Sequence, residues 1–264
     1  MVDEPSKPLS GGPPRWLTSV RATLDAAPAP VPVFFRDDDA GWRDDRLDAL
    51  LARFARAGVP VDLAVIPAAL APAAARRLRG AVEGAGGRIG VHQHGFAHRN
   101  HEAAGRKHEF GPSRDQAQQR RDIEAGRARL AELLGPVVEP VFTPPWNRCT
   151  ATTGRCLAEL GFEVLSRLAG AEPFGLPGLR ELPVRVDWFA HRRGIRLSRA
   201  ELGDRLAAAV AAPGPLGIML HHPVMDDAEL DDLDALLALL AGHPRVRFGR
   251  ILALAREGPG HAPL

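Results

Sequence analysis

The chain has 264 residues, of which 45% are hydrophobic and 25% charged, and its formal net charge is +2. This composition is ordinary for a globular protein with a sizeable core, and the length fits a single α/β barrel. Basic residues are scattered and no stretch approaches roughly eighteen apolar residues, which argues against a nucleic-acid-binding protein and against a membrane span.

Apolar runs alternate with longer amphipathic stretches along most of the chain. Residues 1–14, rich in proline, glycine and serine, predict a flexible tail before a single catalytic domain at residues 15–264. The predicted strands are Val31–Arg36, Val61–Ile66, Arg88–Gln93, Glu139–Thr143, Phe162–Ser166, Leu182–Val186 and Leu216–Leu220, with a weaker one at Val246–Phe248. The predicted helices are Trp16–Ala26, Asp44–Ala57, Ala71–Gly84, Ser113–Leu134, Thr150–Leu160, Ser198–Ala211 and Asp226–Leu240.

This alternation of strands and helices indicates parallel β-α units. An irregular, TIM-like (β/α) barrel of about seven parallel strands accounts for the length better than an open sheet, although the pattern is compatible with both. The segment Leu168–Arg180 lacks helical periodicity, so we expect one barrel helix to be missing there.

The cysteines and the N-terminal residues indicate the cellular compartment in which the protein is expected. Cys149 and Cys156 are the only cysteines and lie about two helical turns apart, which is too far for them to bridge each other. The first residues include acidic residues and prolines where a signal peptide needs a basic start and an apolar core. We therefore expect a cytoplasmic protein with two free thiols.

Polar residues follow five of the predicted strands, at the end where the active sites of (β/α) barrels lie. Because the carboxyl ends of parallel strands meet at one face of a barrel, we expect these side chains to lie close together. They are Asp37-Asp38-Asp39, the histidines His92, His94 and His98, the run Pro144–Asn147, Asp187-Trp188, and His221-His222.

His94 and His98 are four residues apart, a spacing that stacks both imidazoles on one face if the chain turns helical. With one carboxylate from Asp37–Asp39, they can bind a divalent ion and leave positions open on it. A second aspartate can then act as general base on a water whose pKa the ion lowers, and His221 can protonate the leaving group. Trp146 and Trp188 are candidates for a pocket wall, or alternatively for core packing. The pattern predicts a metal-dependent hydrolase of an amide or ester.

These motifs resemble those of the polysaccharide deacetylase (NodB-homology) family of metal-dependent carbohydrate N-deacetylases. The family's T-F-D-D-G is similar to R-D-D-D-A-G at Arg36–Gly41, and its H-[ST]-x-x-H to H-G-F-A-H at His94–His98. Its third motif, R-x-P-[YF]-G, corresponds loosely to Phe142–Arg148. Its D-W and L-H match Asp187-Trp188 and Leu220-His221. The resemblance implies an irregular (β/α) barrel that removes an acetyl group from an amino sugar.

Carried over residue by residue, the family's metal ligands fall on Asp39, His94 and His98, with Asp38 as base, when the first motif is aligned on its glycine. Alignment on the first aspartate instead makes Asp37 the base and Asp38 the ligand. The resemblance also implies a divalent metal, with zinc expected and cobalt, manganese or nickel as alternatives.

The other motifs supply the rest of the implied site. His221 corresponds to the general acid and Asp187 to its orienting partner. The loop of Pro145, Trp146 and Asn147, together with Trp188, would contact substrate, and a backbone N–H of this loop would bind the oxyanion. The family's polymer-active members are mostly exported, and we expect no export signal here, so the expected substrate is a small molecule or an oligosaccharide. The scattered basic residues and the lack of a long apolar run predict neither a nucleic-acid nor a membrane partner.

Two positions depart from the family pattern. Thr143 stands at the apparent position of the third-motif arginine, which contacts the catalytic aspartate, and Arg36 and Arg148 are the candidates to replace its charge. His222 stands where an aspartate commonly follows the fifth-motif histidine. Two alternative functions remain: a non-catalytic descendant that binds a sugar or acylated ligand, and a non-haem iron enzyme, which also uses two histidines and one carboxylate.

Overall fold

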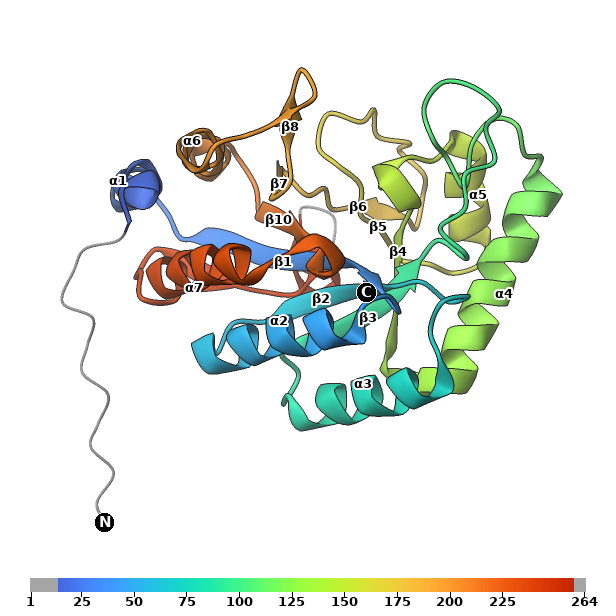
Figure 1. Ribbon diagram of the computed structural model, residues 1–264. Helices are drawn as coiled ribbons and strands as arrows, with labels where there is room; N and C mark the ends of the chain where they lie inside the picture. The colour runs from blue at the N-terminus through green and yellow to red at the C-terminus, as the bar shows by residue number, and fades with distance from the viewer. Residues whose placement is uncertain (1–13, 259–264) are drawn as a thin grey trace, which may run out of the picture.

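A curled sheet forms the centre of the computed structural model, which describes residues 14–258 (Figure 1). The predicted tail therefore lies almost entirely outside the described residues. The nine strands run in the order β6-β5-β4-β3-β2-β1-β10-β7, with β11 beside β1, and all neighbouring strands are parallel. They are β1 (Val31–Ala40), β2 (Val61–Val65), β3 (Ile89–His94), β4 (Val138–Thr143), β5 (Val164–Leu165), β6 (Arg180–Glu181), β7 (Val186–Asp187), β10 (Leu216–Leu220) and β11 (Val246–Phe248).

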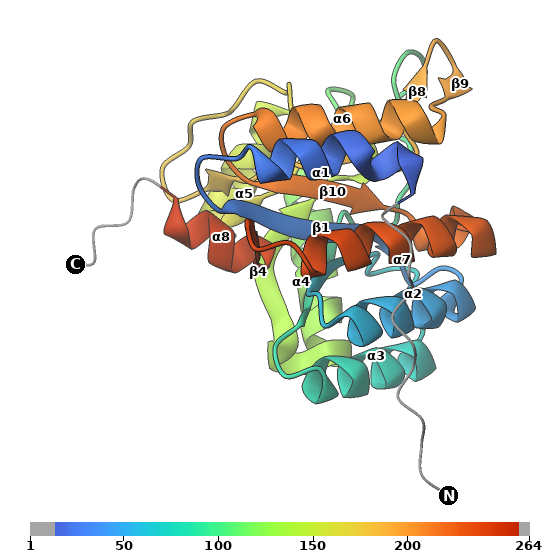
Figure 2. The same cartoon turned by 90° about the vertical axis from the view of Figure 1, so that its left-hand side faces the viewer.

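Helices surround this sheet, and α1 lies alongside α6 (Figure 2). The helices are α1 (Thr18–Asp25), α2 (Asp44–Ala57), α3 (Pro72–Gly84), α4 (Gln116–Leu134), α5 (Ala151–Glu159), α6 (Arg199–Ala211), α7 (Asp227–Ala241) and α8 (Ile251–Glu257). Short 3₁₀ turns occur at Arg15–Leu17, Gly135–Val137, Pro145–Asn147 and His222–Val224, and β8 (His191–Arg192) pairs with β9 (Ile195–Arg196) in an antiparallel hairpin. Among the described helices, none is long and apolar enough to cross a membrane.

Local sequence signals set the ends of several helices. Leu47, Leu50 and Phe54 are buried on one face of α2, at the spacing of an amphipathic helix. This helix ends at Gly58, whose φ of 68° is a left-handed conformation that glycine adopts at little cost. At the start of α4, Asp115 and Gln118 form a reciprocal capping box.

The segment between β6 and β7 joins the two edges of the sheet. Leu182 N donates to Leu165 O at 3.1 Å on one side, and Arg185 N donates to Gly217 O at 2.8 Å on the other. The predicted strand Leu182–Val186 is thus an extended segment flanked by two short strands, and it closes the sheet into an irregular barrel. The described residues between β5 and β6 form no helix, which confirms the predicted gap in the helical ring.

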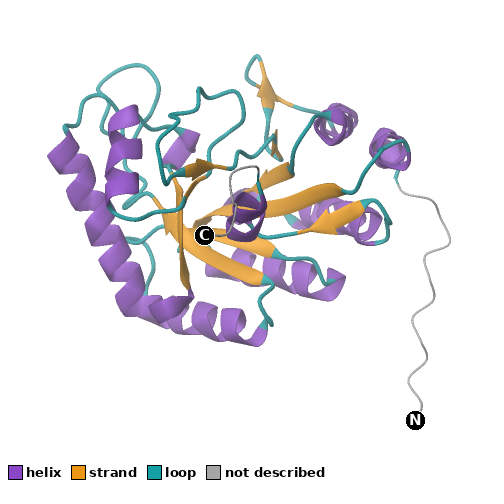
Figure 3. Cartoon of the chain, turned by 180° about the vertical axis from the view of Figure 1, so that it is seen from behind, coloured by secondary structure: helices purple, strands orange, loops and turns teal. Residues whose placement is uncertain are grey.

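The interior of the barrel changes from apolar to polar along its strands. Phe34, Val141 and Val164 form an inner cluster with residues of α8, which lies at the centre of the curl in Figure 3. Because side chains alternate across a strand, the next inward positions lie two residues further on each strand. These positions carry Arg36, Thr143 and Ser166, all buried. Polar groups therefore fill the carboxyl end of the barrel above an apolar floor.

Candidate metal and catalytic site

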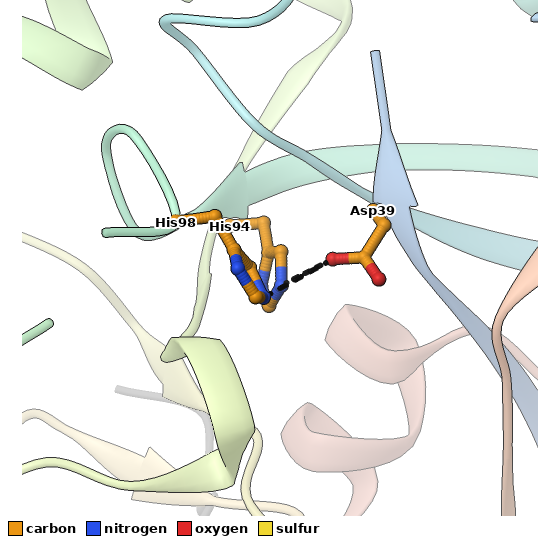
Figure 4. Close-up of side chains that lie close together, drawn as sticks. All are labelled: Asp39, His94 and His98. Atoms are coloured by element: carbon orange, nitrogen blue, oxygen red, sulfur yellow. Dashed lines mark ion pairs between the residues drawn. The ribbon is translucent and has the colours of Figure 1, made fainter. Parts of the chain in front are cut away.

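Three predicted ligand side chains meet at the carboxyl end of the barrel. Asp39 comes from the end of β1, His94 from the end of β3, and His98 from the loop that follows β3 (Figure 4). The Nε2 atoms of His94 and His98 each lie 3.3 Å from Asp39 Oδ1. The possible ligand atoms of the three residues all lie within 4.8 Å of one another. This separation lets one cation contact all three.

The two histidines converge through a loop and not through the helical turn that their spacing would allow. Residues 95–98 are not helical, and Gly95 and His98 both have positive φ, 53° and 54°. The buried Glu109, which the sequence analysis missed, fixes this loop with its carboxylate. That carboxylate accepts hydrogen bonds from the backbone N–H groups of Phe96, Ala97 and Arg99.

The protonation pattern around the three residues suits a divalent cation. His94 Nδ1 lies 3.0 Å from Thr143 O, a carbonyl that only accepts, so Nδ1 carries a hydrogen and Nε2 is the ring nitrogen that faces Asp39. Burial raises the pKa of Asp39, but His94, His221 and His98 outweigh it and lower the pKa to about 2. Asp39 Oδ1 is buried without a hydrogen-bond partner among the described residues. An anionic carboxylate facing two imidazole nitrogens fits zinc or a similar metal.

Asp38 lies beside this set in a buried ion pair with Arg36. Arg36 Nε lies 2.7 Å from Asp38 Oδ1 and Nη2 lies 2.9 Å from Oδ2, which is a bidentate contact. Arg36 also donates to Ser166 O and Oγ and to Asn147 Oδ1, so its guanidinium is held from several sides. Burial raises the pKa of Asp38, but the charges of Arg36 and His94 outweigh it, and the pKa lies below its usual value.

Asp37 is used differently from its two neighbours. Its carboxylate accepts hydrogen bonds from His222 N at 2.9 Å and from His222 Nδ1 at 2.6 Å. His222 Nε2 lies 2.8 Å from Trp42 O, which can only accept, so both ring nitrogens carry hydrogens. His222 is therefore an imidazolium paired with Asp37. This pairing favours the alignment in which Asp38 is the base and Asp39 the ligand.

His221 and Asp187 are close in the fold, but no hydrogen bond joins them. His221 Nδ1 is buried without a partner among the described residues. Asp187 Oδ1 accepts the Phe189 N–H at 2.8 Å, and the Phe189 ring lies 6.2 Å from the His221 ring, centroid to centroid. The predicted orienting contact is thus absent, and Asp187 acts on His221 at most through the position of Phe189.

Trp188 is a core residue, which corrects its prediction as a pocket wall. Its side chain is 2% exposed within the main apolar cluster. The ring packs edge-on against Trp16 with centroids 6.1 Å apart, and Nε1 donates to Glu229. Trp188 lies at a buried strand end next to α6 and α7, and sequence alone does not distinguish such a core position from a pocket wall.

Two other tryptophans flank His98, one of the three candidate metal ligands. The rings of Trp146 and Trp42 lie 4.5 Å and 5.0 Å from the His98 ring, centroid to centroid. Trp42, which the sequence analysis missed, is 39% exposed. Pro145 is buried, and Asn147 is engaged by Arg36 and Met219. Among the predicted substrate residues, Trp146 therefore has the side chain best placed to meet a ligand.

Left-handed backbone conformations are concentrated at this site. Outside glycine, φ is positive at Asp39 (72°), His98 (54°), Trp146 (56°) and Asn147 (57°), as well as at Arg43 and Arg193. Such conformations cost of the order of 1 kcal/mol each and persist where surrounding contacts enforce them. Their presence at two ligand positions and in the adjacent loop is typical of a functional site.

Solved structures share this fold. A protein of Mycobacterium smegmatis assigned to the polysaccharide deacetylases has a TM-score of 0.69 at 18% identity, over 88% of this chain and 91% of that one. A family 4 acetyl xylan esterase from Clostridium thermocellum, in complex with a cobalt ion, has a TM-score of 0.57 at 15% identity over 84% and 89%. A family 4 pseudoenzyme from Bacillus anthracis has a TM-score of 0.57 at 13% identity over 87% and 66%.

The chain has the polysaccharide deacetylase fold. No protein-family model matches the chain, and no curated protein matches its sequence. The likeness is therefore one of structure, and the departures from the family's motifs can be followed in the contacts of individual residues.

Within the polysaccharide deacetylase fold, the first departure from the family's motifs concerns the arginine that contacts Asp38. This arginine lies on a different strand from the one that the motifs indicate. Arg36 on β1 contacts Asp38, the contact that the resemblance assigns to a third-motif arginine. At the apparent position of that arginine, Thr143 Oγ1 instead lies 2.8 Å from His92 Nε2. The other candidate, Arg148, donates to Lys107 O and makes no ion pair among the described residues. Of the two candidates, Arg36 is therefore the one whose guanidinium contacts Asp38.

The second departure, His222 in place of an aspartate, is also accompanied by a changed residue on β1. His222 stands where the family commonly has an aspartate, and Asp37 stands at a position that is apolar in the family motif. The two form the buried ion pair described above. The acidic residue therefore lies on β1, and the pair links β1 to the turn after β10.

The Asp37–His222 pair predicts a pH-dependent stability. Burial lowers the pKa of His222, but Asp37 and Trp42 O outweigh it, so the pKa in the folded protein lies above 6.5. A raised histidine pKa stabilises the fold fully below pH 6.5, and this contribution is lost as the pH rises through the folded pKa. We expect His222→Asn to cost about 3 kcal/mol of unfolding free energy at pH 6 and clearly less at pH 9. Urea unfolding of both metal-loaded proteins measures the difference, and an equal cost at both pH values would contradict the pairing.

Proposed function

We propose that the protein is a metal-dependent hydrolase of non-peptide C–N amide bonds, most simply an N-deacetylase of a small acetylated amino sugar. The observation that carries this proposal is the position of the Arg36–Asp38 pair beside Asp39, His94 and His98. Metal binding alone needs only the ligands, whereas hydrolysis needs a base next to them.

The proposed ligands are Asp39, His94 and His98, and zinc is the expected ion. When bound there, it would polarise the acyl carbonyl and lower the pKa of water. Asp38 is anionic because its pKa is lowered, so it can accept the proton of the attacking water. His221, on the turn after β10, would donate a proton to the leaving nitrogen.

The backbone of the Pro145–Asn147 turn would hold the developing oxyanion. Pro145 has no N–H, and Asn147 N donates to Pro144 O at 2.9 Å. Arg148 N donates to Pro145 O. The Trp146 N–H is therefore the amide of this turn that we assign to the oxyanion. Its left-handed conformation, φ 56°, supports a role beyond ordinary turn geometry.

The two alternative functions have weaker support. The case for a non-catalytic descendant came from the missing third-motif arginine, and Arg36 supplies that charge at Asp38. One structural neighbour is a pseudoenzyme, so the fold by itself does not decide between a hydrolase and a non-catalytic protein. A non-haem iron enzyme would have no use for a buried, arginine-paired aspartate next to its ligand set. Both alternatives predict no acetate release.

Acetate release from N-acetylated sugars tests the proposal. The purified protein is treated with chelator and then reloaded with zinc, cobalt or manganese in separate samples. We expect release that disappears with chelation and returns with at least one metal, because Asp38 alone cannot activate water at a useful rate. Oxygen consumption with the iron-loaded protein, or no release from any N-acyl substrate, would overturn it.

A further inference from the structure

A group of cations without acidic partners lies on one side of the candidate site. We name Arg106, Lys107 and Arg148 the basic cluster. Lys107 Nζ lies 6.0 Å from the centroid of the Trp146 ring, and Arg148 Nη1 donates to Lys107 O at 3.4 Å. Among the described residues, none of the three forms an ion pair with a carboxylate, although many arginines elsewhere do, as Arg53 does with Asp234.

The loop that carries Arg106 and Lys107 contains several internal hydrogen bonds. Asn100 Oδ1 accepts hydrogen bonds from Glu102 N at 3.2 Å and from His108 N at 3.0 Å. His101 N donates to His108 O at 2.9 Å, which closes the base of the loop. These bonds fix the ends of the loop, whose exposed Arg106 and Lys107 lie near Arg148.

Two acids of the same segment of the chain, Glu102 and Glu109, have other hydrogen-bond partners. The Glu102 carboxylate accepts Ser113 N at 3.2 Å and Ser113 Oγ at 2.9 Å. Glu109 is buried under the His94–His98 loop, where it binds backbone amides. Partial burial, and then the charge of Arg106, lower the pKa of Arg148, so like charges repel across the cluster. Repulsion of this kind is relieved when an anion binds.

The cluster is connected to the metal ligands through one aromatic ring. The Trp146 ring has Lys107 on one side and the metal ligand His98 on another, with the two ring centroids 4.5 Å apart. A ligand that touches Trp146 can therefore reach both the cations and the metal site. An aromatic face packs well against the apolar face of a sugar ring.

We propose that the basic cluster binds an anionic group, a phosphate or a carboxylate, of the same small substrate whose acyl group is cleaved at the metal site. Arginine guanidinium groups bind either anion through paired hydrogen bonds, and lysine adds a point charge. This inference rests on the proposed function for the acyl group, but the anion site is defined by its own residues. It narrows the substrate class from acetylated amino sugars to charged ones.

The test compares neutral and anionic probes by calorimetry at low salt. N-acetylglucosamine, its 6-phosphate and N-acetylmuramic acid are titrated into the metal-loaded protein, and then into the chelated protein. We expect one of the two anionic probes to bind at least about tenfold more tightly than the neutral sugar, and this preference to weaken with salt. The anion that gains affinity identifies phosphate or carboxylate as the ligand.

A matched pair of variants locates the site. Arg106→Gln/Arg148→Gln is expected to abolish the preference for the anionic probe, whereas Arg76→Gln/Arg121→Gln, which removes the same charge from exposed helix positions, is expected to retain it. Equal affinity for neutral and anionic probes, or equal effects of the two double variants, would overturn the proposal. So would a preference that vanishes on chelation, because the anion would then lie on the metal.

The outcomes separate this inference from the proposed function. If the anionic probe binds through the cluster and no acetate is released from any substrate, the anion site stands and the hydrolase proposal fails. If neutral and anionic N-acetyl sugars bind and are hydrolysed equally well, the hydrolase proposal stands and the anion site fails.

Discussion

Replacement of Arg36 with threonine is expected to reduce kcat by about 100-fold or more, because Asp38 would lose the cation that keeps it anionic and oriented. The same change leaves a buried carboxylate unpaired, so we also expect a loss of about 3 kcal/mol of unfolding free energy. A third effect is specific to the ion pair. Without Arg36 the pKa of Asp38 rises, and the acid limb of the kcat/KM profile moves to higher pH. Steady-state kinetics from pH 4 to pH 9 measure the loss of kcat and the shift of the acid limb. The loss of unfolding free energy is measured separately by denaturation.

Three companion variants separate positioning from folding. Arg36→Lys keeps the charge but not the bidentate contact, so it should fall between wild type and Arg36→Thr. The reciprocal variant Arg36→Thr/Thr143→Arg returns the charge to the strand on which the family carries it, and we expect partial recovery of kcat. Arg76→Thr removes an exposed arginine and should change nothing. An unmoved acid limb in Arg36→Thr would show that Arg36 has only a structural role.

Replacement of His94 with alanine is expected to lower metal affinity by more than about 100-fold, which exceeds the loss usual for residues that only orient a ligand. His94 is almost fully buried and its Nδ1 is held by Thr143 O, so water cannot reproduce the lost nitrogen in the same place. Activity at limiting metal should fall to background. Metal content after dialysis against a metal buffer measures the affinity directly.

The control for this variant is His191→Ala, which removes an exposed histidine on the β8–β9 hairpin, away from the ligand set. It should bind metal as wild type does. A stabilising effect of zinc on the thermal unfolding of wild type, absent in His94→Ala, would give a second and independent readout. Wild-type metal affinity in His94→Ala would exclude the proposed ligand set.

Sequence periodicity predicted the main elements of the barrel closely. The predicted bounds of α2 (Asp44–Ala57), β10 (Leu216–Leu220) and β11 (Val246–Phe248) agree with the structure. These segments have clear hydrophobic patterns and strong end signals. The seven-residue α8 was missed because a short apolar stretch carries little periodic signal. Closure of the barrel at Leu182–Val186 depends on hydrogen bonds to two distant strands, which no local pattern encodes.

The site was predictable where the carboxyl ends of strands supply the residues. Asp39 and His94 meet because the parallel strands β1 and β3 end at the same face of the barrel, whereas the loop after β3 brings His98 to them. The roles of Glu109 and Trp42 depend on loop conformations with left-handed residues, which sequence does not reveal. Arg36 could be named only as one of two candidates, because the inward direction of its side chain becomes certain only when the barrel register is known.

Turnover by Asp38→Asn, compared with wild type at equal metal content, shows whether Asp38 is the base of a metal-dependent hydrolase. Asparagine preserves the shape of the side chain but cannot accept a proton, and Asp38 is not among the proposed ligands. Acetate release from an N-acetylated substrate is expected to fall by about 10² to 10⁴-fold while zinc remains bound. Unchanged turnover, or loss of the metal together with the activity, would contradict the assignment of Asp38 as the base of a metal-dependent hydrolase.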